Sequence, residues 1–247
     1  MYKRRTCILT GATGGGGYEI AHKIYGAGMN MILVGTSDEK LEKLSKELER
    51  KDGKGAIDHV VSNFTEPGEV QEAAQQIIQK TGKGIDVLIN NAGVGYHCPV
   101  ERIKQDDLIA TMQINTIAPI LLCSILLPHL KRSDDSQIIN ISSVLGSKGV
   151  PNTSTYTASK HALNGFTDVL RKEIDNHGPR VTQIEPGAIE TPFTERITDH
   201  ETARELRSRK MHKIPPSEIA LWVMKILESD TSVRPEVVRL MPKDQII

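Results

Sequence analysis

The sequence predicts an α/β protein in which about seven parallel strands form a sheet covered by helices on both faces. Short apolar runs alternate with longer helical patterns, and this order is typical of consecutive β-α-β units. The runs lack polar alternation, which indicates strands that are buried on both faces. No linker divides the 247 residues, so 1–247 is predicted to be a single doubly wound, three-layer domain.

The expected elements follow one another along the whole chain. Leu41, Leu44 and Leu48, for example, show the spacing of an amphipathic helix. The predicted strands are Thr6–Thr10, Met31–Gly35, Ala56–Ser62, Ile85–Asn90, Gln137–Ser142, Val181–Glu185 and Val237–Met241. The predicted helices are Gly15–Gly28, Asp38–Lys51, Pro67–Thr81, Asp106–Lys131, Ser154–His177 and Pro216–Ser229. Between the last two strands, Glu195–Lys213 is highly charged with few apolar anchors, and 192–215 is interpreted either as a mobile substrate lid or as a solvated surface helix.

Composition argues against several classes of protein. Lys plus Arg is 31 and Asp plus Glu is 31, and this balance disfavours a dedicated nucleic-acid binder or a membrane-surface protein. The longest apolar stretch, Ile117–Leu127, contains Pro119 and Ser124, so we expect no membrane span and a cytoplasmic location. The 3 cysteines form no CxxC pair, so we expect neither a disulfide framework nor a metal site.

A glycine-rich turn follows the first predicted strand. Residues Thr10–Gly17 read TGATGGGG, and a predicted helix comes next. Glycines let backbone approach a pyrophosphate, and the helix N-terminus supplies free N–H groups and the positive end of a dipole. The usual GxGxxG spacing is absent, and a flexible loop without a ligand is the alternative. The flanking strand and helix favour a Rossmann-type dinucleotide site.

Tyr156 and Lys160 lie four residues apart, on one face of a predicted helix. A tyrosine hydroxyl normally titrates at about 10, and a nearby ammonium favours the phenolate and lowers that pKa. The pair can therefore act as an acid/base on a carbonyl or an alcohol. Considered alone, the pair is more often a surface tyrosine packed along a lysine.

Four motifs resemble the short-chain dehydrogenase/reductase family in their order and spacing. They are Thr10-Gly-x-x-x-Gly-x-Gly17, Asn90-Asn91-Ala92-Gly93, Tyr156-x-x-x-Lys160 and Pro186-Gly187. The resemblance covers essentially the whole chain. It implies an NAD(P)-dependent oxidoreductase that transfers a hydride between nicotinamide and a small-molecule carbonyl or secondary alcohol. It also implies a homodimer or homotetramer.

The resemblance assigns roles to individual residues. Tyr156 is the general acid/base, and Lys160 lowers its pKa and holds the nicotinamide ribose. Ser143 polarises the substrate, while strand alternation places Ser142 on the opposite side. Asn115 corresponds to a helix asparagine that supports a proton relay to the lysine, although a buried structural role is its alternative. The implied cofactor contacts are Gly11, Thr13, Gly15, Gly16, Gly17, Thr36, Ser37, Asn63, Asn91, Ala92, Gly93, Tyr156, Lys160, Pro186, Gly187, Ile189 and Thr191, with Asn90 also expected to line the cleft.

Two positions depart from the family pattern. Gly16 stands where the family carries a bulky aliphatic residue beside the nicotinamide, so weakened cofactor affinity or orientation is expected. Thr36 stands where an acidic residue would bind the ribose 2′-hydroxyl and reject a 2′-phosphate. The hydroxyls of Thr36 and Ser37 can bond a phosphate, with Lys40 nearby, so we predict NADP over NAD. Asp38 either faces the ribose or caps the following helix.

The substrate pocket is expected to involve Gly95, Tyr96, His97, Val144, Leu145 and Phe193. Among these, His97 could bond a substrate carboxylate or simply be solvated. Two other functions stay open. A ketoacyl-carrier reductase of lipid or polyketide synthesis would need a basic docking patch, for which the candidates are Arg204, Arg207, Arg209 and Lys210. A non-catalytic NAD(P)-binding sensor is suggested by Gly16 and the uncharged Thr36.

Overall fold

The computed structural model describes residues 5–50, 55–82, 84–174, 178–193, 197, 199–208 and 212–245. In this part of the chain, seven strands form one parallel sheet in the order β3-β2-β1-β4-β5-β6-β7. The strands are β1 (Thr6–Thr10), β2 (Asn30–Gly35), β3 (Ile57–Val61), β4 (Val87–Asn90), β5 (Gln137–Ile141), β6 (Arg180–Pro186) and β7 (Val237–Leu240). The predicted α/β class and parallel sheet are confirmed.

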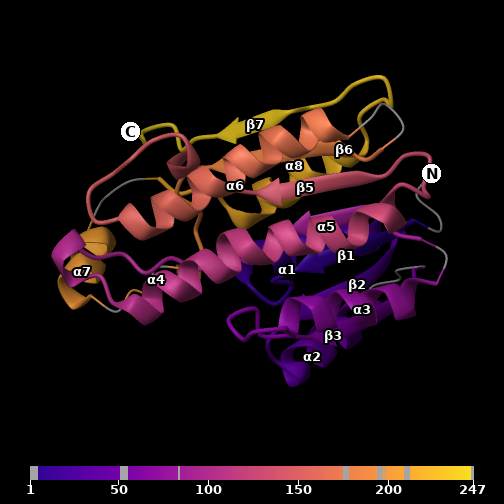
Figure 1. The fold of residues 1–247 in the computed structure, drawn as a ribbon, viewed down its shortest axis with the longest axis horizontal. Helices are drawn as coiled ribbons and strands as arrows, with labels where there is room; N and C mark the ends of the chain where they lie inside the picture. The colour runs from indigo at the N-terminus through magenta and orange to yellow at the C-terminus, as the bar shows by residue number, and fades with distance from the viewer. Residues whose placement is uncertain are drawn as a thin grey trace.

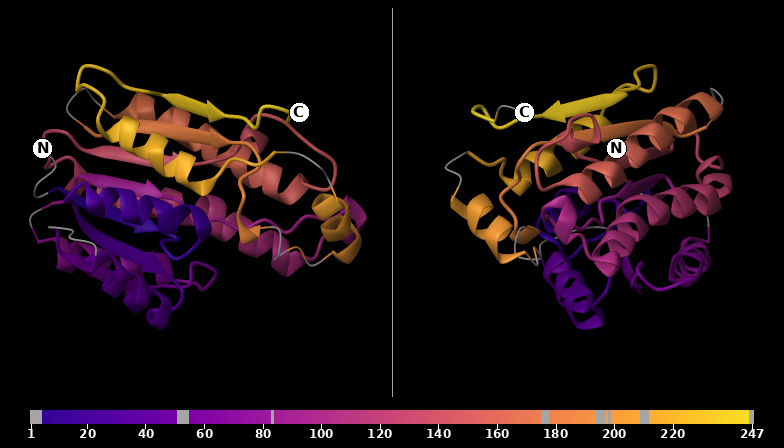
Figure 2. Two further views of the ribbon diagram at one scale, coloured as in Figure 1. Left: turned by 180° about the vertical axis from the view of Figure 1, so that it is seen from behind. Right: turned by 60° about the vertical axis from the view of Figure 1, so that its left-hand side comes forward.

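Helices cover both faces of the sheet (Figures 1 and 2). One face carries α1 (Gly15–Gly26), α2 (Asp38–Glu49) and α8 (Pro216–Leu227), and the other carries α3 (Glu69–Thr81), α5 (Ala118–Leu130) and α6 (Ser154–Glu173). The arrowheads of the strands point toward the end of the molecule where α4 (Gln105–Met112) and α7 (His200–Ser208) lie (Figure 1). The carboxyl ends of the strands therefore face these two helices.

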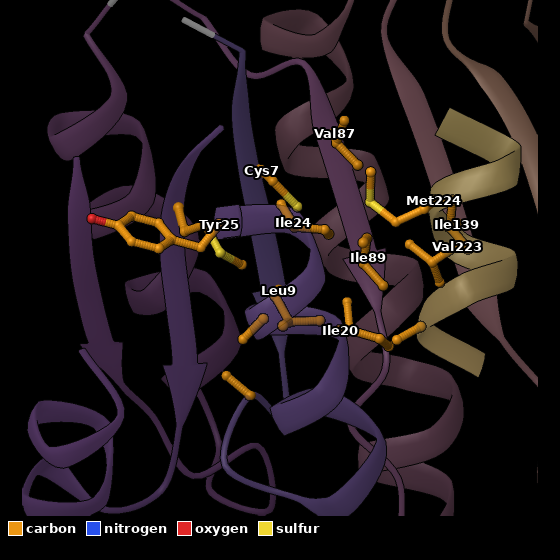
Figure 3. Packing of buried hydrophobic residues seen from close by; sticks show 14 of the residues in the cluster. Cys7, Leu9, Ile20, Ile24, Tyr25, Val87, Ile89, Ile139, Val223 and Met224 are labelled. Atoms are coloured by element: carbon orange, nitrogen blue, oxygen red, sulfur yellow. The ribbon is translucent and has the colours of Figure 1, made fainter. Parts of the chain in front are cut away.

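Strand β1 shows why its sequence lacks polar alternation. Cys7 and Leu9 pack into the core under α1, α2 and α8, whereas Ile8 packs into the core under α3, α5 and α6. Figure 3 shows Cys7 and Leu9 against Ile20 and Ile24 of α1. Successive side chains of a strand point to opposite faces, and burying each large aliphatic side chain contributes about 1.5–3 kcal/mol. Both faces of the sheet are therefore held by apolar packing.

The long helical stretch after β4 contains one irregular turn. Between α4 and α5, Gln113–Ile117 forms a π-helical turn. Such turns are rare and occur frequently at functional sites. The predicted single helix Asp106–Lys131 missed it, because one wider turn leaves the period of the apolar residues almost unchanged.

This stretch also bears on the membrane prediction. The helix Gln105–Leu130 is long and apolar enough, by length and composition alone, to cross a membrane. The sequence argument considered only Ile117–Leu127 and so underestimated its length. Interior helices of water-soluble proteins pass the same test, and here α5 packs between α3 and α6.

Helix α7 accounts for much of the predicted lid. In the described part of this segment Ile197 and Ala203 are buried, whereas Arg204 is exposed. Arg102 Nη1 lies 3.0 Å from both Asp199 Oδ2 and Glu201 Oε2, which connects α7 to the loop before α4. Residues 194–196, 198 and 209–211 of the predicted lid, and the end of the predicted helix Ser154–His177, lie outside the described residues.

Candidate active site

The candidate site lies at the carboxyl ends of the central strands. The strand order reverses between β1 and β4, and parallel sheets of this kind bind ligands in the crevice at such a switch point. The glycine turn follows β1, Asn91-Ala92-Gly93 follows β4, Ser143 follows β5 and Gly187 follows β6. The topology therefore brings three of the four sequence motifs, together with Ser143, to the carboxyl ends of the strands.

The glycine turn is tight at three positions and open at a fourth. Gly11 has φ +64°, a conformation that favours glycine. A Cβ on Gly17 would lie 2.1 Å from Gly11 O, and one on Gly15 would lie 2.8 Å from Thr191 Cγ2. At Gly16, the nearest atom to an added Cβ is Asn91 Oδ1 at 3.4 Å. Gly16 is therefore the one of these four glycines whose surroundings do not require glycine.

The turn and the start of α1 fit a dinucleotide pyrophosphate. Gly14 is the N-cap of α1 and makes no side-chain cap hydrogen bond, and the first turn of the helix carries no acidic residue. The first N–H groups of an α-helix lack intrahelical acceptors and attract an anion. Gly14 is exposed and Gly15 and Gly16 are half-buried, so the backbone at these three residues is accessible. These residues could hold the pyrophosphate.

Asn91 fixes the turn from the neighbouring strand. Its Nδ2 donates to Thr10 O at 3.0 Å and to Gly11 O at 3.2 Å, and its backbone N donates to Thr10 Oγ1 at 3.0 Å. Ala92 N donates to the same hydroxyl at 3.0 Å. Asn91 and Ala92, which were predicted to contact the cofactor, therefore also hold the glycine turn in position.

Asn90 does not line the cleft as predicted. Its Nδ2 donates to Asn140 Oδ1 at 2.8 Å, and Asn140 Nδ2 donates to Thr167 Oγ1 at 2.9 Å. These three side chains are buried between β4, β5 and α6. Successive side chains of a strand point to opposite faces of the sheet, and the side chain of Asn90 is on the face that points into the interior.

Tyr156 and Lys160 are brought together near the N-terminal end of α6. Tyr156 is 9% exposed and Lys160 is 3% exposed, so neither is a surface residue. Lys160 Nζ lies 5.7 Å from the centroid of the Tyr156 ring and donates to Ile141 O at 2.9 Å. A Cβ on Gly93 would lie 3.8 Å from Lys160 Nζ. The lysine therefore reaches the end of β5 and the turn after β4.

The pKa of Tyr156 differs from the sequence expectation. Burial raises the pKa of its hydroxyl to about 12, and a hydrogen bond with the Ser143 side chain offsets part of this effect. Burial also lowers the pKa of Lys160 to about 8. Loss of water disfavours the charged form of both groups. The predicted lowering of the Tyr156 pKa by Lys160 is therefore wrong for the protein alone, and Tyr156 is a protonated phenol at neutral pH.

The two consecutive serines after β5 point to different places. Ser143 Oγ accepts from Leu145 N at 3.1 Å and interacts with Tyr156. Ser142 Oγ donates to Asn164 Oδ1 on the other side. The choice of Ser143 rather than Ser142 for the site therefore agrees with the direction of the side chains.

Asn115 sits in the π-helical turn and is fully buried. Its Oδ1 accepts from Val94 N at 2.9 Å, and its Nδ2 donates to Val94 O at 2.8 Å and to Ser159 Oγ at 3.0 Å. The side chain therefore joins α6 to the loop after β4. A Cβ on Gly93 would lie 3.4 Å from Asn115 Oδ1, so the asparagine also borders the turn beside Lys160.

The segment after β6 closes the other side of the crevice. Gly187 N donates to Leu240 O at 2.7 Å, and Ile189 pairs with Ile214 in a short parallel bridge. Thr191 lies against Gly15, as the close approach of its Cγ2 shows. The Pro186-Gly187 motif and the glycine turn are therefore adjacent in space.

The region expected to bind the adenosine end is open to solvent. Thr36 is exposed, and Ser37, rather than Asp38, is the N-cap of α2, with its Oγ accepting from Lys40 N at 3.3 Å. Asp38 Oδ1 lies 2.7 Å from His59 Nε2. The helix-cap alternative for Asp38 is therefore wrong, because Ser37 holds that position, and Asp38 contacts β3 instead.

Asn63 lies at the end of β3, next to this exposed region. Its Oδ1 accepts from Thr65 Oγ1 at 2.9 Å, and its Nδ2 donates to Glu66 Oε1 at 3.4 Å. The side chain of Asn63 therefore forms its hydrogen bonds within its own loop.

A buried polar network behind Ser142 was not predicted. Asn164 Nδ2 and Gln183 Nε2 donate to Glu185 Oε1 at 2.9 and 2.7 Å, and Arg239 Nη2 lies 2.6 Å from Glu185 Oε2. Glu185 is 2% exposed. The sequence carries no signal for this network, because isolated polar residues on a helix and two strands resemble surface positions.

Two aromatic rings adjoin Tyr156. The His97 and Phe193 centroids lie 5.5 Å from the Tyr156 centroid and 6.3 Å from each other. His97 is 8% exposed, so the alternative of a solvated loop histidine is wrong. Val144, from the same predicted pocket, is also buried.

The described residues contain no group of three or more His, Cys, Asp or Glu that could hold a metal ion. Cys7 and Cys123 are buried free thiols, and Cys98 is half-buried.

Sequence comparisons identify several related proteins. A family model described as short chain dehydrogenase matches residues 5–202. The dehydrogenase/reductase SDR family member 7B of Bos taurus is 38% identical over 188 residues, which cover 74% of this chain but only 58% of that protein. The 3-oxoacyl-[acyl-carrier-protein] reductase FabG of Thermotoga maritima is 34% identical over 234 residues, which cover 92% of each chain.

Solved structures share the fold across nearly the whole chain. A metagenomic short-chain oxidoreductase in complex with NADP matches with a TM-score of 0.81 and 26% identity, covering 99% of both chains. An alcohol dehydrogenase from Thermococcus sibiricus complexed with 5-hydroxy-NADP matches with a TM-score of 0.87 at 22% identity, again over 99% of both chains.

Proposed function

The chain belongs to the short-chain dehydrogenase/reductase family of NAD(P)-dependent oxidoreductases, and from this premise we propose that it reduces a small carbonyl substrate with NADPH. The observation that carries the proposal is the buried Tyr156 beside Ser143 and Lys160. A protonated phenol can donate the proton that carbonyl reduction requires.

The residues of the site act on the oxygen of the substrate. A bound nicotinamide cofactor supplies the hydride. Ser143 donates a hydrogen bond to the carbonyl oxygen, and Tyr156 gives it a proton as negative charge develops, as in an oxyanion site. Lys160 holds the ribose and positions Tyr156, and Asn115 keeps the loop after β4 against α6. A proton relay through Asn115 remains a prediction.

Several features support NADP over NAD. Thr36 supplies a hydroxyl where an acidic side chain would reject the 2′-phosphate. Asp38, the nearest carboxylate in sequence, contacts His59. Lys40 is exposed within the first turn of α2. One solved relative was crystallised in complex with NADP.

The test measures turnover of each cofactor at subsaturating concentration with a panel of ketones. NADPH should be used with the higher kcat/KM. A clear preference for NADH would reject the cofactor assignment, whereas no oxidation of either cofactor with any ketone would reject the carbonyl reductase.

A 3-oxoacyl-carrier reductase is a second candidate. The match to FabG across nearly all of both chains favours it. Arg204 is exposed on α7, whereas the Arg207 side chain, Arg209 and Lys210 lie outside the described residues. A kcat/KM for acetoacetyl-carrier protein well above that for acetoacetyl-pantetheine would support a docking patch, and equal values would exclude it.

We also propose that the chain forms a homo-oligomer through α4–α6. Large apolar side chains are exposed on α4, on the π-helical turn and on α6, at Leu108, Ile109, Ile117 and Val169. Where such side chains form a contiguous surface, they mark an association site. Light scattering at micromolar concentration should give a dimer or tetramer, and a monomer would contradict the proposal.

A further inference from the structure

His97 is a buried histidine whose two ring nitrogens have no hydrogen-bond partner among the described residues. Its 8% exposure leaves the ring little access to bulk solvent. Leaving a buried polar group unpaired carries the full desolvation penalty of that group. Most buried polar groups are therefore paired, and an exception calls for a functional explanation.

The His97 ring lies beside the acid/base centre. Its centroid is 5.5 Å from that of Tyr156, and Phe193 stands edge-on to both rings. A Cβ on Gly95 would lie 2.9 Å from His97 Nε2, so the glycine leaves room for the imidazole. A small molecule that displaces Phe193 to reach Tyr156 would meet His97 as well.

The charge of His97 limits what it can bind. Burial lowers its pKa to about 4, so the ring is neutral at physiological pH. A neutral imidazole has one N–H donor and one acceptor nitrogen. It suits an uncharged carbonyl or hydroxyl oxygen. It offers no positive charge to compensate a buried carboxylate, which would be costly to desolvate. The substrate carboxylate considered from the sequence is therefore the less suitable ligand.

We propose that His97 determines specificity by binding a second, uncharged oxygen of the ketone substrate. The substrate class is then a small ketone with an acyl or hydroxyl oxygen one or two carbons from the reacting carbonyl. The proposal rests on the carbonyl reductase function, in which Tyr156 and Ser143 bind the reacting oxygen. A site built to hydrogen-bond a substrate oxygen strongly rejects the analogue without it, because its own polar group then stays unpaired.

The experiment compares three substrates of similar size with NADPH: methyl acetoacetate, 2-hexanone and the acetoacetate anion. Wild-type protein should favour methyl acetoacetate over each of the others by about tenfold or more in kcat/KM. His97→Phe should lower the ratio of methyl acetoacetate to 2-hexanone at least tenfold. His97→Gln keeps a hydrogen-bond donor and an acceptor, so it should retain most of the preference for methyl acetoacetate over 2-hexanone. His161→Phe, at an exposed position on α6, should leave the ratio unchanged.

Each outcome separates the two proposals. An equal loss with both ketones in His97→Phe would indicate a structural role and overturn the specificity proposal alone. A wild-type preference for acetoacetate would also overturn it. If His97→Phe does not fold, His97→Leu carries the same expectation. Failure of wild-type protein to reduce any of the three substrates, while Tyr156→Phe behaves identically, would reject the carbonyl reductase and the His97 proposal with it.

Discussion

The two ends of the proposed cofactor site are built in opposite ways. At the catalytic end, Tyr156, Lys160 and Asn115 are buried, and several elements determine their positions. At the adenosine end, Thr36 and Asn63 are exposed. The hydrogen bonds of Asn63 are to residues of its own loop. The chemistry is thus fixed by the fold, whereas cofactor choice depends on side chains that the fold barely constrains. Substitutions should consequently have their largest effects at the catalytic end.

Tyr156→Phe tests the catalytic end most severely. It removes the hydroxyl that donates the proton while keeping the ring that packs against His97 and Phe193. Because positioned proton transfer typically contributes about 10²–10⁴-fold, kcat should fall by about that factor. Steady-state turnover measures the loss, and cofactor titration by fluorescence should give an unchanged Kd. Near-normal turnover of this variant would show that Tyr156 is not the proton donor.

Lys160→Met tests burial at the same end through stability. The folded-state pKa of Lys160 is about 8, below the ordinary value of 10.5, so between these values the unfolded chain binds more protons. The contribution of Lys160 to the free energy of unfolding therefore rises with pH between about 8 and 10.5, and it does not change with pH below that range. The free energy of unfolding of the wild type minus that of the variant should increase by about 2 kcal/mol from pH 8 to 9.5. Urea unfolding across that range measures it, and a constant difference would mean that the ammonium is solvated.

Gly17→Ala and Gly16→Ala probe the boundary between the two ends. An added Cβ at 17 would lie 2.1 Å from Gly11 O, whereas at 16 it would meet only Asn91 Oδ1 at 3.4 Å. Distorted backbone costs about 1–3 kcal/mol, so Gly17→Ala should weaken NADPH binding about tenfold or more. Gly16→Ala should be nearly neutral. Isothermal titration gives both affinities, and equal losses would mean that the turn adapts to either side chain.

At the catalytic end, the sequence predicted which residues lie together but not how deeply they are buried. The resemblance singled out Ser143, and helical spacing placed Tyr156 and Lys160 on one face of a helix; parallel topology brings the loop after β5 to the carboxyl ends of the neighbouring strands. The tyrosine pKa was mispredicted, since a local pair shows the ammonium but not the burial that raises the pKa to about 12.

Contacts distant in sequence were also beyond prediction. The π-helical turn around Asn115 and the pairing of Asp38 with His59 depend on tertiary structure. A strand neighbour far along the chain leaves no mark in the local pattern. For this reason the sequence did not predict the contact of Asp38 with His59, and its helix-cap alternative for Asp38 was wrong.

Thr36→Asp tests the adenosine end, where the smallest effect is expected. The new carboxylate would repel a 2′-phosphate and accept from a ribose 2′-hydroxyl, which shifts preference toward NAD. Because position 36 is exposed, solvent screening limits such an interaction to about 1 kcal/mol, or roughly fivefold in the NADPH/NADH ratio of kcat/KM. Thr36→Arg should shift the ratio the other way, and Tyr156-dependent turnover at saturating cofactor should persist in both. A shift of a hundredfold or more would mean that this corner becomes buried when cofactor binds, and the contrast between the two ends would then hold only for the free protein.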